Sequence, residues 1–597
     1  MNKNLVKTVL ILLTFLGLSM SNAIAESTYV ITGSGTKFTC VKDGTNTVAS
    51  EKPIQDVINA IKFDAQSNVC IIQFGNGNST LDIGTAGIGI YEDWYDPDPY
   101  PWGNLITLTG KLTSAKEGVI IGMEDTTIEN WADITASNKG TVFDVYQYAK
   151  LIIKEGTITS TNGIAVANYG GELTINGATV QASGSSGIAI YSDGQCLTTI
   201  KDGSMVTSEN TNTTKGTIYV KYGDVNINGG MVRNTATDSN AIRNDCDRPM
   251  SITGGIIEVT TGLAVWNFSA GTLTISGGNI NATGNGGRAV RNESTGTVNI
   301  SGGTVTATTG TAVENHGDGT VNIIGGIVLL TGDSGWAIAS YNKGTVNISG
   351  GTVTATTATA IISTGTVNIS GGTVSTTTGI TIGNHDVGTV TITGGLILAK
   401  EGHTIFHIGS AEKINISGGI VFAYGTADTD IINGDYTQSG DAVLVAWNKD
   451  AGHTTYEFGT SDDIFKFPVA ATAIWAKESS SGGISVDYNT TKGFIPIEGV
   501  TITGVGIETV TSYELQVYPN PTSGELKIAT SECPISDIQI YDVVGKLVGQ
   551  SKIGQSEIEM NISHLPVGIY FLRIQTENGV ITRKIIKYRS CGTYHEQ

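Results

Sequence analysis

The chain has 597 residues, of which 79 are glycine and 15% are charged, and its formal net charge is −20. An acidic chain argues against a nucleic-acid partner, which requires clusters of lysine and arginine to neutralise phosphates. The length predicts several domains or one repeat array, and the valine and isoleucine that recur throughout argue against a disordered chain.

The first 25 residues, MNKNLVKTVLILLTFLGLSMSNAIA, have the three parts of a secretory signal peptide. Lys3 and Lys7 make a short basic region, residues 9–18 form an apolar run, and residues 23–25 form a small-residue cleavage site. The apolar run is too short to span a bilayer. We therefore expect an exported mature protein without a transmembrane segment.

The segment SEKPIQDVINAIK, residues 50–62, has the pattern of an amphipathic helix. Its apolar residues follow at helical spacing: Ile54, Val57, Ile58 and Ile61. Ser50 would be the N-cap, and Pro53 lies in the first turn. We expect this helix to cover the open end of a repeat array, within an N-terminal cap and first coils at residues 26–100.

The chain has six cysteines, which could pair in an exported protein. Cys40 and Cys70 flank the small N-terminal region and are the best candidate pair. Cys591 lies in the C-terminal tail and is a candidate free thiol.

The stretch YEDWYDPDPYPWGN, residues 91–104, combines acidic and aromatic side chains in a stiff, proline-rich loop. Its carboxylates are oxygen ligands of the kind that Ca²⁺ takes, although their spacing matches no EF-hand. Trp94 and Trp102 offer surfaces on which a sugar ring could stack. The alternative is an acidic loop that only covers the first coils, and we favour it because no metal template fits. Calcium is the only cofactor that the sequence suggests.

Residues 101–425 repeat a short phrase, and GTVNISGGTVTATT occurs identically at 296–309 and 344–357. A small residue follows each such phrase at intervals of 21 to 27 residues: Gly177, Asp202, Gly229, Gly254, Gly277, Gly302, Gly325, Gly350, Gly371, Gly394 and Gly418. This period predicts a solenoid. Within each repeat β-branched and polar residues alternate, and glycine marks the breaks. The pattern predicts three short strands per coil, stacked as a parallel β-helix.

An asparagine precedes the repeated small residue by nine or ten positions in six coils: Asn168, Asn244, Asn267, Asn292, Asn315 and Asn384. Each follows a valine or isoleucine by two positions, so its side chain points inward with that residue. A buried amide must be hydrogen-bonded. We therefore expect a structural ladder in which these side chains bond to one another and to the turn backbone.

The residue before the asparagine position points outward, and this column reads Tyr191, Ile218, Arg243, Trp266, Arg291, Glu314 and Ala339. Arg243, Trp266, Arg291 and Glu314 should stack on one face, with arginine over the indole ring. This face could bind a carboxylated glycan, or it could be a surface ladder without a ligand. We favour the ladder, because surface charges usually contribute little. No spacing indicates a catalytic triad or a metal site, so we assign no catalytic and no metal-binding residues.

Residues 26–425 resemble the pectate-lyase-like right-handed parallel β-helices in their capping helix, coil length and asparagine ladder. The resemblance implies an all-β solenoid. That superfamily contains polysaccharide lyases and hydrolases as well as adhesins and surface proteins, so the fold does not select a function. The repeat fades after residue 425, and we interpret residues 426–505 as a C-terminal cap or a small β-domain.

Residues 512–587 resemble the type A sorting domain of the type IX secretion system of Bacteroidota. Four motifs occur in order: ELQVYPNPTSGELKI, IQIYDVVGKLV, ISHLPVGIYFLRI and RKIIK. The motif residues are Tyr518, Pro519, Asn520, Pro521, Gly524, Gly545, Gly568, Tyr570, Lys584 and Lys587. Turn residues between alternating runs predict a small antiparallel β-sandwich. Residues 588–597 continue past the usual end of the motif as an atypical tail.

The sequence as a whole predicts a secreted or surface-attached β-helix protein that acts in adhesion or glycan binding. The alternative is a polysaccharide lyase or glycoside hydrolase, with the outward column as its groove. The expected partners are the type IX secretion machinery and a polysaccharide or a host or cell-surface molecule. We expect a monomer that binds no nucleic acid.

Overall fold

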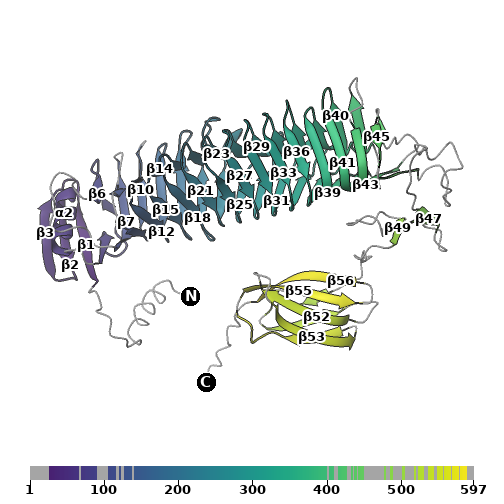
Figure 1. Cartoon of the computed structure of the whole chain (residues 1–597). Helices are drawn as coiled ribbons and strands as arrows, with labels where there is room; N and C mark the ends of the chain where they lie inside the picture. The colour runs from purple at the N-terminus through teal and green to yellow at the C-terminus, as the bar shows by residue number, and fades with distance from the viewer. Residues whose placement is uncertain are drawn as a thin grey trace.

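A long right-handed β-solenoid of about 12 turns makes up most of the protein (Figure 1). The computed structural model describes residues 26–65, 69–90, 105–115, 120–122, 127–137, 140–399, 403–408, 414–425, 432–433, 436–439, 442–448, 476–478, 484–487, 500–503, 516–518, 522, 524–529, 535–542, 547–555, 557–566, 568–576 and 579–587. The strands of successive coils pair in parallel, and the all-β, β-helical fold class is confirmed.

Each regular coil contributes three strands, two to a 31-stranded sheet (sheet A) and one to a 15-stranded sheet (sheet B). The first strand position of sheet A contains β9 (Thr127–Asn130), β12 (Lys150–Ile153), β15 (Glu172–Ile175), β18 (Leu197–Ile200), β21 (Asp224–Ile227), β24 (Met250–Ile252), β27 (Thr272–Ile275), β30 (Thr297–Ile300), β33 (Thr320–Ile323) and β36 (Thr345–Ile348). The second contains β10 (Asp133–Ala136), β13 (Thr157–Thr161), β16 (Thr179–Ser183), β19 (Met205–Ser208), β22 (Met231–Asn234), β25 (Ile256–Val259), β28 (Asn279–Ala282), β31 (Thr304–Ala307), β34 (Ile327–Leu330) and β37 (Thr352–Ala355).

Sheet B supplies the third side of the coil. It contains β6 (Ile88–Ile90), β8 (Ile120–Gly122), β11 (Phe143–Tyr146), β14 (Ile164–Tyr169), β17 (Ile188–Ser192), β20 (Ile218–Val220), β23 (Ser239–Asn244), β26 (Gly262–Asn267), β29 (Arg288–Asn292), β32 (Gly310–Asn315), β35 (Gly335–Ser340), β38 (Thr359–Ser363), β40 (Ile382–His385), β42 (Ile405–Ile408) and β44 (Ile432–Asn433).

Longer and shorter strands complete sheet A at its two ends. Four long strands run through both positions of a coil: β7 (Leu105–Ser114), β39 (Thr366–Thr376), β41 (Thr389–Ala399) and β43 (Ile414–Gly425). The N-terminal strands are β1 (Ser27–Ser34), β2 (Lys37–Lys42), β3 (Asn46–Lys52), β4 (Cys70–Phe74) and β5 (Leu81–Asp82), and the last strands are β45 (Tyr436–Gln438) and β46 (Val443–Asn448).

The repeated phrase TVNI forms the same strand in consecutive coils. Val298 and Ile300 are fully buried, and their counterparts in the coils above and below are buried too. Asn299 faces outward and pairs with Asn322, which pairs with Asn347. Each amide donates to the one before it, at 2.8 Å from Asn322 Nδ2 to Asn299 Oδ1 and 2.9 Å from Asn347 Nδ2 to Asn322 Oδ1. Each coil must therefore offer the same shape to the next, which explains the repetition.

The paired glycines after this phrase allow the coils to approach closely at one corner. A Cβ atom on Gly325 would lie 2.4 Å from the carbonyl oxygen of Ser301, which is closer than any real contact. Gly326 also has a φ of 72°, which lies in the left-handed region that favours glycine. Side chains are therefore excluded from this corner by sterics as well as by backbone conformation.

The predicted capping helix exists, but its N-terminus differs from the prediction. Helix α2 spans Ile54–Ala65 and buries the apolar face read from the sequence. Ser50 is not the N-cap, because it lies in strand β3. The first helical hydrogen bond runs from Val57 N to the carbonyl oxygen of Pro53, at 3.1 Å. The strand therefore extends to the proline, whose missing N–H and fixed φ suit a helix start.

The proposed pairing of Cys40 with Cys70 is wrong, because both are buried free thiols. Strand β1 lies between them, with Cys40 opposite Ile31 on one edge and Cys70 opposite Ser27 on the other. Two strand spacings amount to about 9.6 Å, which is beyond the reach of a disulfide. Burial raises the pKa of each thiol to about 12, so both are unreactive at neutral pH.

The C-terminal strands form two small antiparallel sheets, as expected for a sandwich. One sheet contains β50 (Gln516–Tyr518), β51 (Glu525–Ala529) and β54 (Glu557–Asn561), and the other contains β52 (Ile535–Asp542), β53 (Leu547–Gln555), β55 (Gly568–Thr576) and β56 (Gly579–Lys587). Leu526, Ile538 and Leu572 belong to a shared apolar core. A further three-stranded sheet contains β47 (Ala476–Glu478), β48 (Ile484–Asp487) and β49 (Val500–Thr503).

Several predicted features lie outside the described residues. They are the signal peptide at 1–25, the loop at 91–104 with Trp94 and Trp102, the motif residues Pro519, Asn520, Pro521 and Gly545, and the tail at 588–597 with Cys591. Within the part of the chain that the structure describes, no helix has both the length and the apolar character needed to cross a membrane.

Candidate ligand-binding face

The outer face of sheet B carries the column of side chains singled out in the sequence. The structure brings Arg243, Trp266, Arg291 and Glu314 into direct register on β23, β26, β29 and β32. Ile218 does not belong to this column, because it is fully buried in the core. Tyr219 pairs with Arg243 instead. The turn after β20 is one residue shorter than in the following coil, so counting back from Gly229 misplaces the column by one position.

Arg243 is held tightly on this face. Its side chain is only 8% exposed, and its Nε donates to Asp245 Oδ1 at 2.6 Å. The guanidinium carbon lies 4.1 Å from the ring centroid of Trp266 and 4.3 Å from that of Phe268. The two rings meet edge to face at 5.4 Å. The arginine therefore fixes an aromatic pair by cation–π contact and is itself neutralised by a carboxylate.

The next coils continue this pattern of paired charges. Glu314 has a buried side chain, and its Oε2 lies 2.5 Å from Arg288 Nε and 3.8 Å from Arg291 Nε. Arg291 Nε also lies 2.5 Å from Glu293 Oε2. Each arginine of the face thus has a carboxylate partner. A carboxylated glycan on this face would therefore meet arginines whose charge is already balanced.

Tyrosines extend the face toward the N-terminal end of the solenoid. The rings of Tyr146 and Tyr169 are 5.4 Å apart, those of Tyr169 and Tyr191 are 5.8 Å apart, and those of Tyr191 and Tyr219 are 5.6 Å apart. Tyr191 donates to Asp193 at 2.9 Å. Burial and this hydrogen bond raise the pKa of Tyr191, so its hydroxyl stays protonated as a donor. From Tyr146 to Trp266, aromatic side chains occur on five of six consecutive coils.

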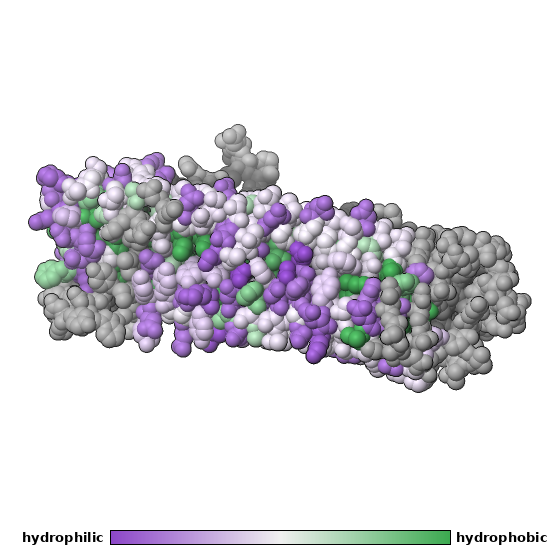
Figure 2. Space-filling view, turned by 90° about the horizontal axis from the view of Figure 1, so that it is seen from above, coloured by the Kyte–Doolittle hydropathy of each residue, from purple (hydrophilic) through white to green (hydrophobic). Residues whose placement is uncertain are grey.

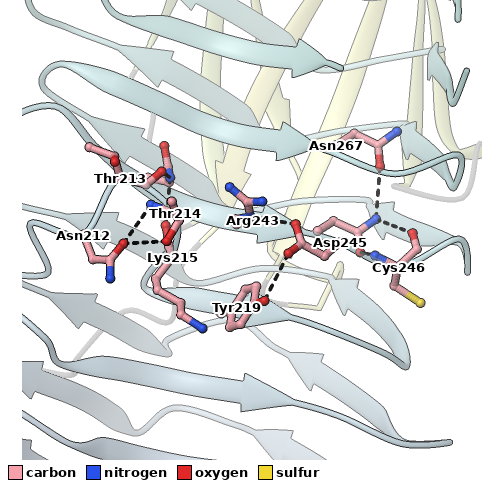
Figure 3. A network of polar contacts seen from close by, with 11 residues as sticks. Asn212, Thr213, Thr214, Lys215, Tyr219, Arg243, Asp245, Cys246 and Asn267 are labelled. Atoms are coloured by element: carbon pink, nitrogen blue, oxygen red, sulfur yellow. Dashed lines mark hydrogen bonds and ion pairs between the residues drawn. The ribbon is translucent and has the colours of Figure 1, made fainter. Parts of the chain in front are cut away.

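One loop places an additional lysine over the face (Figure 3). Lys215 lies in the connection between β19 and β20, and its Nζ is 4.0 Å from the ring centroid of Tyr219. Asn240 fixes the loop by donating to the carbonyl oxygens of Thr213 and Lys215, at 2.9 and 2.8 Å. Burial lowers the pKa of Lys215, with Asp245 acting in the opposite direction. Tyr219 in turn donates to Asp245 at 3.0 Å.

Lys215, Tyr219, Tyr146 and Tyr169 belong to this face but were not predicted from the sequence. One signal for Lys215 was available, because the interval from Asp202 to Gly229 is the longest in the array and marks an insertion. The tyrosines have no comparable signal in the sequence. The outward position was located from the asparagine of each coil, and among the coils of these tyrosines only that of Tyr169 has one, Asn168.

The inward asparagines lie beneath this face. Asn244 donates to Asn267 at 3.0 Å, Asn267 to Asn292 at 2.9 Å, and Asn292 to Asn315 at 3.0 Å. Asn168 and Asn384 do not join this run. Asn168 bonds to Thr198 Oγ1 at 3.3 Å, and Asn384 contacts His407 Nδ1 at 3.1 Å. Serine takes the asparagine position at Ser192, Ser340 and Ser363, which interrupts the ladder.

Asp144 occupies the outward column on β11, and its burial raises its pKa to about 6. In the unfolded chain the same carboxyl group has its ordinary pKa of about 4, so it is protonated only below about pH 4. Asp144 therefore contributes fully to the free energy of unfolding below about pH 4, and this contribution is lost as the pH rises through about 6. We expect Asp144→Asn to stabilise the protein above pH 6 and to have little effect near pH 3.5. Urea unfolding of both proteins across this range measures the difference, and an equal gain at every pH would contradict the prediction.

The C-terminal sandwich retains the features that its motifs require. Gly524 has a φ of 148°, and a Cβ atom there would lie 2.8 Å from Ser563 Cα. Tyr570 is buried, and its hydroxyl donates to the carbonyl oxygen of Pro566 at 2.8 Å. Lys587 is also buried and ends β56 beside Thr522. Tyr518 ends β50, Gly568 begins β55, and Lys584 lies in β56 opposite Phe571.

Residues 516–588 match the family model described as the secretion system C-terminal sorting domain. The chain carries a type IX sorting domain. This sorting domain implies interaction with the type IX secretion machinery, and it indicates that the protein is secreted or attached to the cell surface. A comparison with curated proteins finds none that matches the chain.

Proposed function

We propose that the protein binds polysaccharide at or outside the cell surface, with the sugar chain lying along the outer face of sheet B. The observation that carries this proposal is the row of aromatic rings from Tyr146 to Trp266, which are half-buried except for the buried Tyr219. Successive coils rise by about 4.8 Å, so the row is about 24 Å long. Aromatic rings with a polar rim suit stacking of sugar rings.

The charges of the face support a neutral polysaccharide. Its arginines are paired with carboxylates, and the chain as a whole carries a net charge of −20, which repels polyanions. Paired side chains can still donate and accept hydrogen bonds with hydroxyl groups. On the face shown in Figure 2, most of the coloured residues of the solenoid are hydrophilic or intermediate in hydropathy, with small apolar spots between them.

The test uses the full chain and a panel of neutral and acidic polysaccharides, with bound protein as the readout. We expect Tyr191→Ala/Trp266→Ala to weaken binding of neutral polymers by roughly tenfold or more. Arginine variants are less suitable, because they leave buried carboxylates unpaired. Phe63→Ala is the matched control, since Phe63 is an exposed aromatic on α2. Unchanged binding in the double variant would contradict the proposal.

A second candidate function is cleavage of the bound polysaccharide, and the Lys215 cluster is the observation that favours it. Lys215 lies beside Tyr219, Arg243 and Asp245, and burial lowers its pKa, which is the direction that action as a general base requires. The same incubations are assayed for new reducing or unsaturated ends. Product that is lost in Lys215→Met, with binding retained, would support catalysis. Binding without product would exclude it for the polymers tested.

A further inference from the structure

We infer that a groove at the corner between sheet B and sheet A is a second ligand site, and that it takes a neutral oligosaccharide. The groove has a volume of about 650 Å³ and is lined by residues of successive coils between Thr127 and Arg248. Sites for small molecules typically have about 300–1,000 Å³. The inference uses none of the residues of the sheet B face, so it can fail without affecting the proposed function.

The groove is hollow because one coil has no side chains at this corner. Its turn is Gly170-Gly171, between β14 and β15. A Cβ atom on Gly171 would lie 2.5 Å from the carbonyl oxygen of Ala149, so only glycine fits there. The coil before it presents Tyr148 and the coil after it presents Gln195, each two residues ahead of its strand. The floor is therefore backbone, and the neighbouring side chains form the walls.

One exposed tyrosine, Tyr148, lines the hollow. A second, Tyr222, lies beside it, because its ring centroid is 5.9 Å from the guanidinium carbon of Arg248, which is a lining residue. Tyr148 is 69% exposed and Tyr222 is 40% exposed. Each lies two residues before its strand, and the two strands are three coils apart, about 14 Å along the solenoid. Tyr148 also has a φ of 66°, a left-handed conformation that is unfavourable for a bulky residue. No contact among the described residues requires a tyrosine there, so the exposed ring on a strained backbone points to a role in binding.

The charged groups inside the groove neutralise one another. Lys150 Nζ lies 3.1 Å from Glu172 Oε2. Arg248 makes a two-pronged contact with Asp224, at 2.7 Å from Nε to Oδ1 and 2.7 Å from Nη2 to Oδ2. These pairs leave no net charge to attract an ion. They offer planar donors and acceptors, which match the adjacent hydroxyl groups of a sugar.

The backbone of the groove cannot take up a peptide as an added strand. Leu197 N donates to the carbonyl oxygen of Gly171 at 3.1 Å, and Asp224 N donates to that of Cys196 at 2.8 Å. Strand addition requires free backbone groups at a sheet edge. Recognition must therefore come from the tyrosine rings and polar side chains, and this combination fits an oligosaccharide.

The full chain is titrated calorimetrically with neutral hexasaccharides, namely xylohexaose, cellohexaose, laminarihexaose and maltohexaose. We expect at least one to bind, and Tyr148→Gly and Tyr222→Ala each to weaken it by roughly tenfold. Tyr148→Gly is informative because it removes the ring and also relieves the left-handed backbone. Its thermal stability should stay close to that of the parent, because relief of the left-handed backbone offsets the greater freedom that glycine gives the unfolded chain. Lost binding with an unchanged melting temperature then cannot be attributed to unfolding.

Phe63→Ala serves again as the exposed aromatic control, and Tyr191→Ala/Trp266→Ala separates the two sites. The inference holds if the groove variants lose the hexasaccharide while both controls retain it. It is overturned if no hexasaccharide binds, or if the groove variants bind as the parent does. A chain that binds neutral polymers through the sheet B face but binds no hexasaccharide in the groove would overturn this inference alone.

Discussion

Replacing Asn292 by alanine is expected to destabilise the centre of the solenoid by about 3–5 kcal/mol, because it leaves buried polar groups without partners. Asn292 Nδ2 donates to the carbonyl oxygen of Gly296 at 2.7 Å and to Asn315 Oδ1 at 3.0 Å. Its own Oδ1 accepts from Asn267 at 2.9 Å. All three asparagines are buried, so water cannot replace the lost bonds.

Asn322→Ala is the matched control for this prediction. Asn322 makes the same kind of side-chain ladder, but on the outer face of sheet A, where solvent is close. We expect its loss to cost less than about 1 kcal/mol. Hydrogen exchange of the amides in β29 and β32 measures the local stability, which suits a repeat protein that need not unfold in one step. Equal losses of stability from the two substitutions would contradict the prediction, because burial of the inner ladder would then not determine the cost of removing an asparagine.

Replacing Gly326 by alanine is expected to cost roughly 3 kcal/mol, from two separate penalties. The first is the left-handed backbone, since Gly326 has a φ of 72°. The second is steric, because the new methyl group would lie 2.8 Å from both the carbonyl carbon and the carbonyl oxygen of Gly302 in the preceding coil. Two stacked coils would have to separate locally to accommodate it.

Gly286 separates these two penalties. It has almost the same φ, 71°, but no atom lies within 4 Å of a Cβ built there. Gly286→Ala should therefore cost only the backbone term, about 1 kcal/mol. Thermal and urea unfolding of both variants gives the difference. If Gly286→Ala were as damaging as Gly326→Ala, close stacking would not be the reason for the glycine pair.

The interior of each coil was predictable because it depends on local alternation. Val298 and Ile300 alternate with polar residues in the sequence, and they are buried in the structure for that reason. The run from Asn244 to Asn315 was also readable, because these asparagines recur at nearly constant intervals. The sorting domain was readable because its turn motifs occur in a fixed order.

The surface chemistry was less predictable because it depends on which residues the stacking brings together. The sequence pattern assigned Ile218 to the outward column instead of Tyr219, because the turn after β20 is shorter by one residue and shifts the apparent register. The sequence placed Arg243 and Arg291 on the outer face without partners assigned to them, and the structure shows that Asp245 and Glu293, two positions further on, neutralise them. Alternation indicates that such residues point outward, but it does not indicate their partners.

By itself, the sequence determined that this protein is an exported solenoid with a sorting domain, because period, alternation and motif order are local properties of the chain. Only the tertiary structure decided what the solenoid presents to a ligand. Residues about 25 positions apart become neighbours when coils stack. The surroundings of the Lys215 loop and of the Gly170-Gly171 turn are therefore set by side chains of the neighbouring coils. Stacking of whole coils created both the aromatic face and the corner groove.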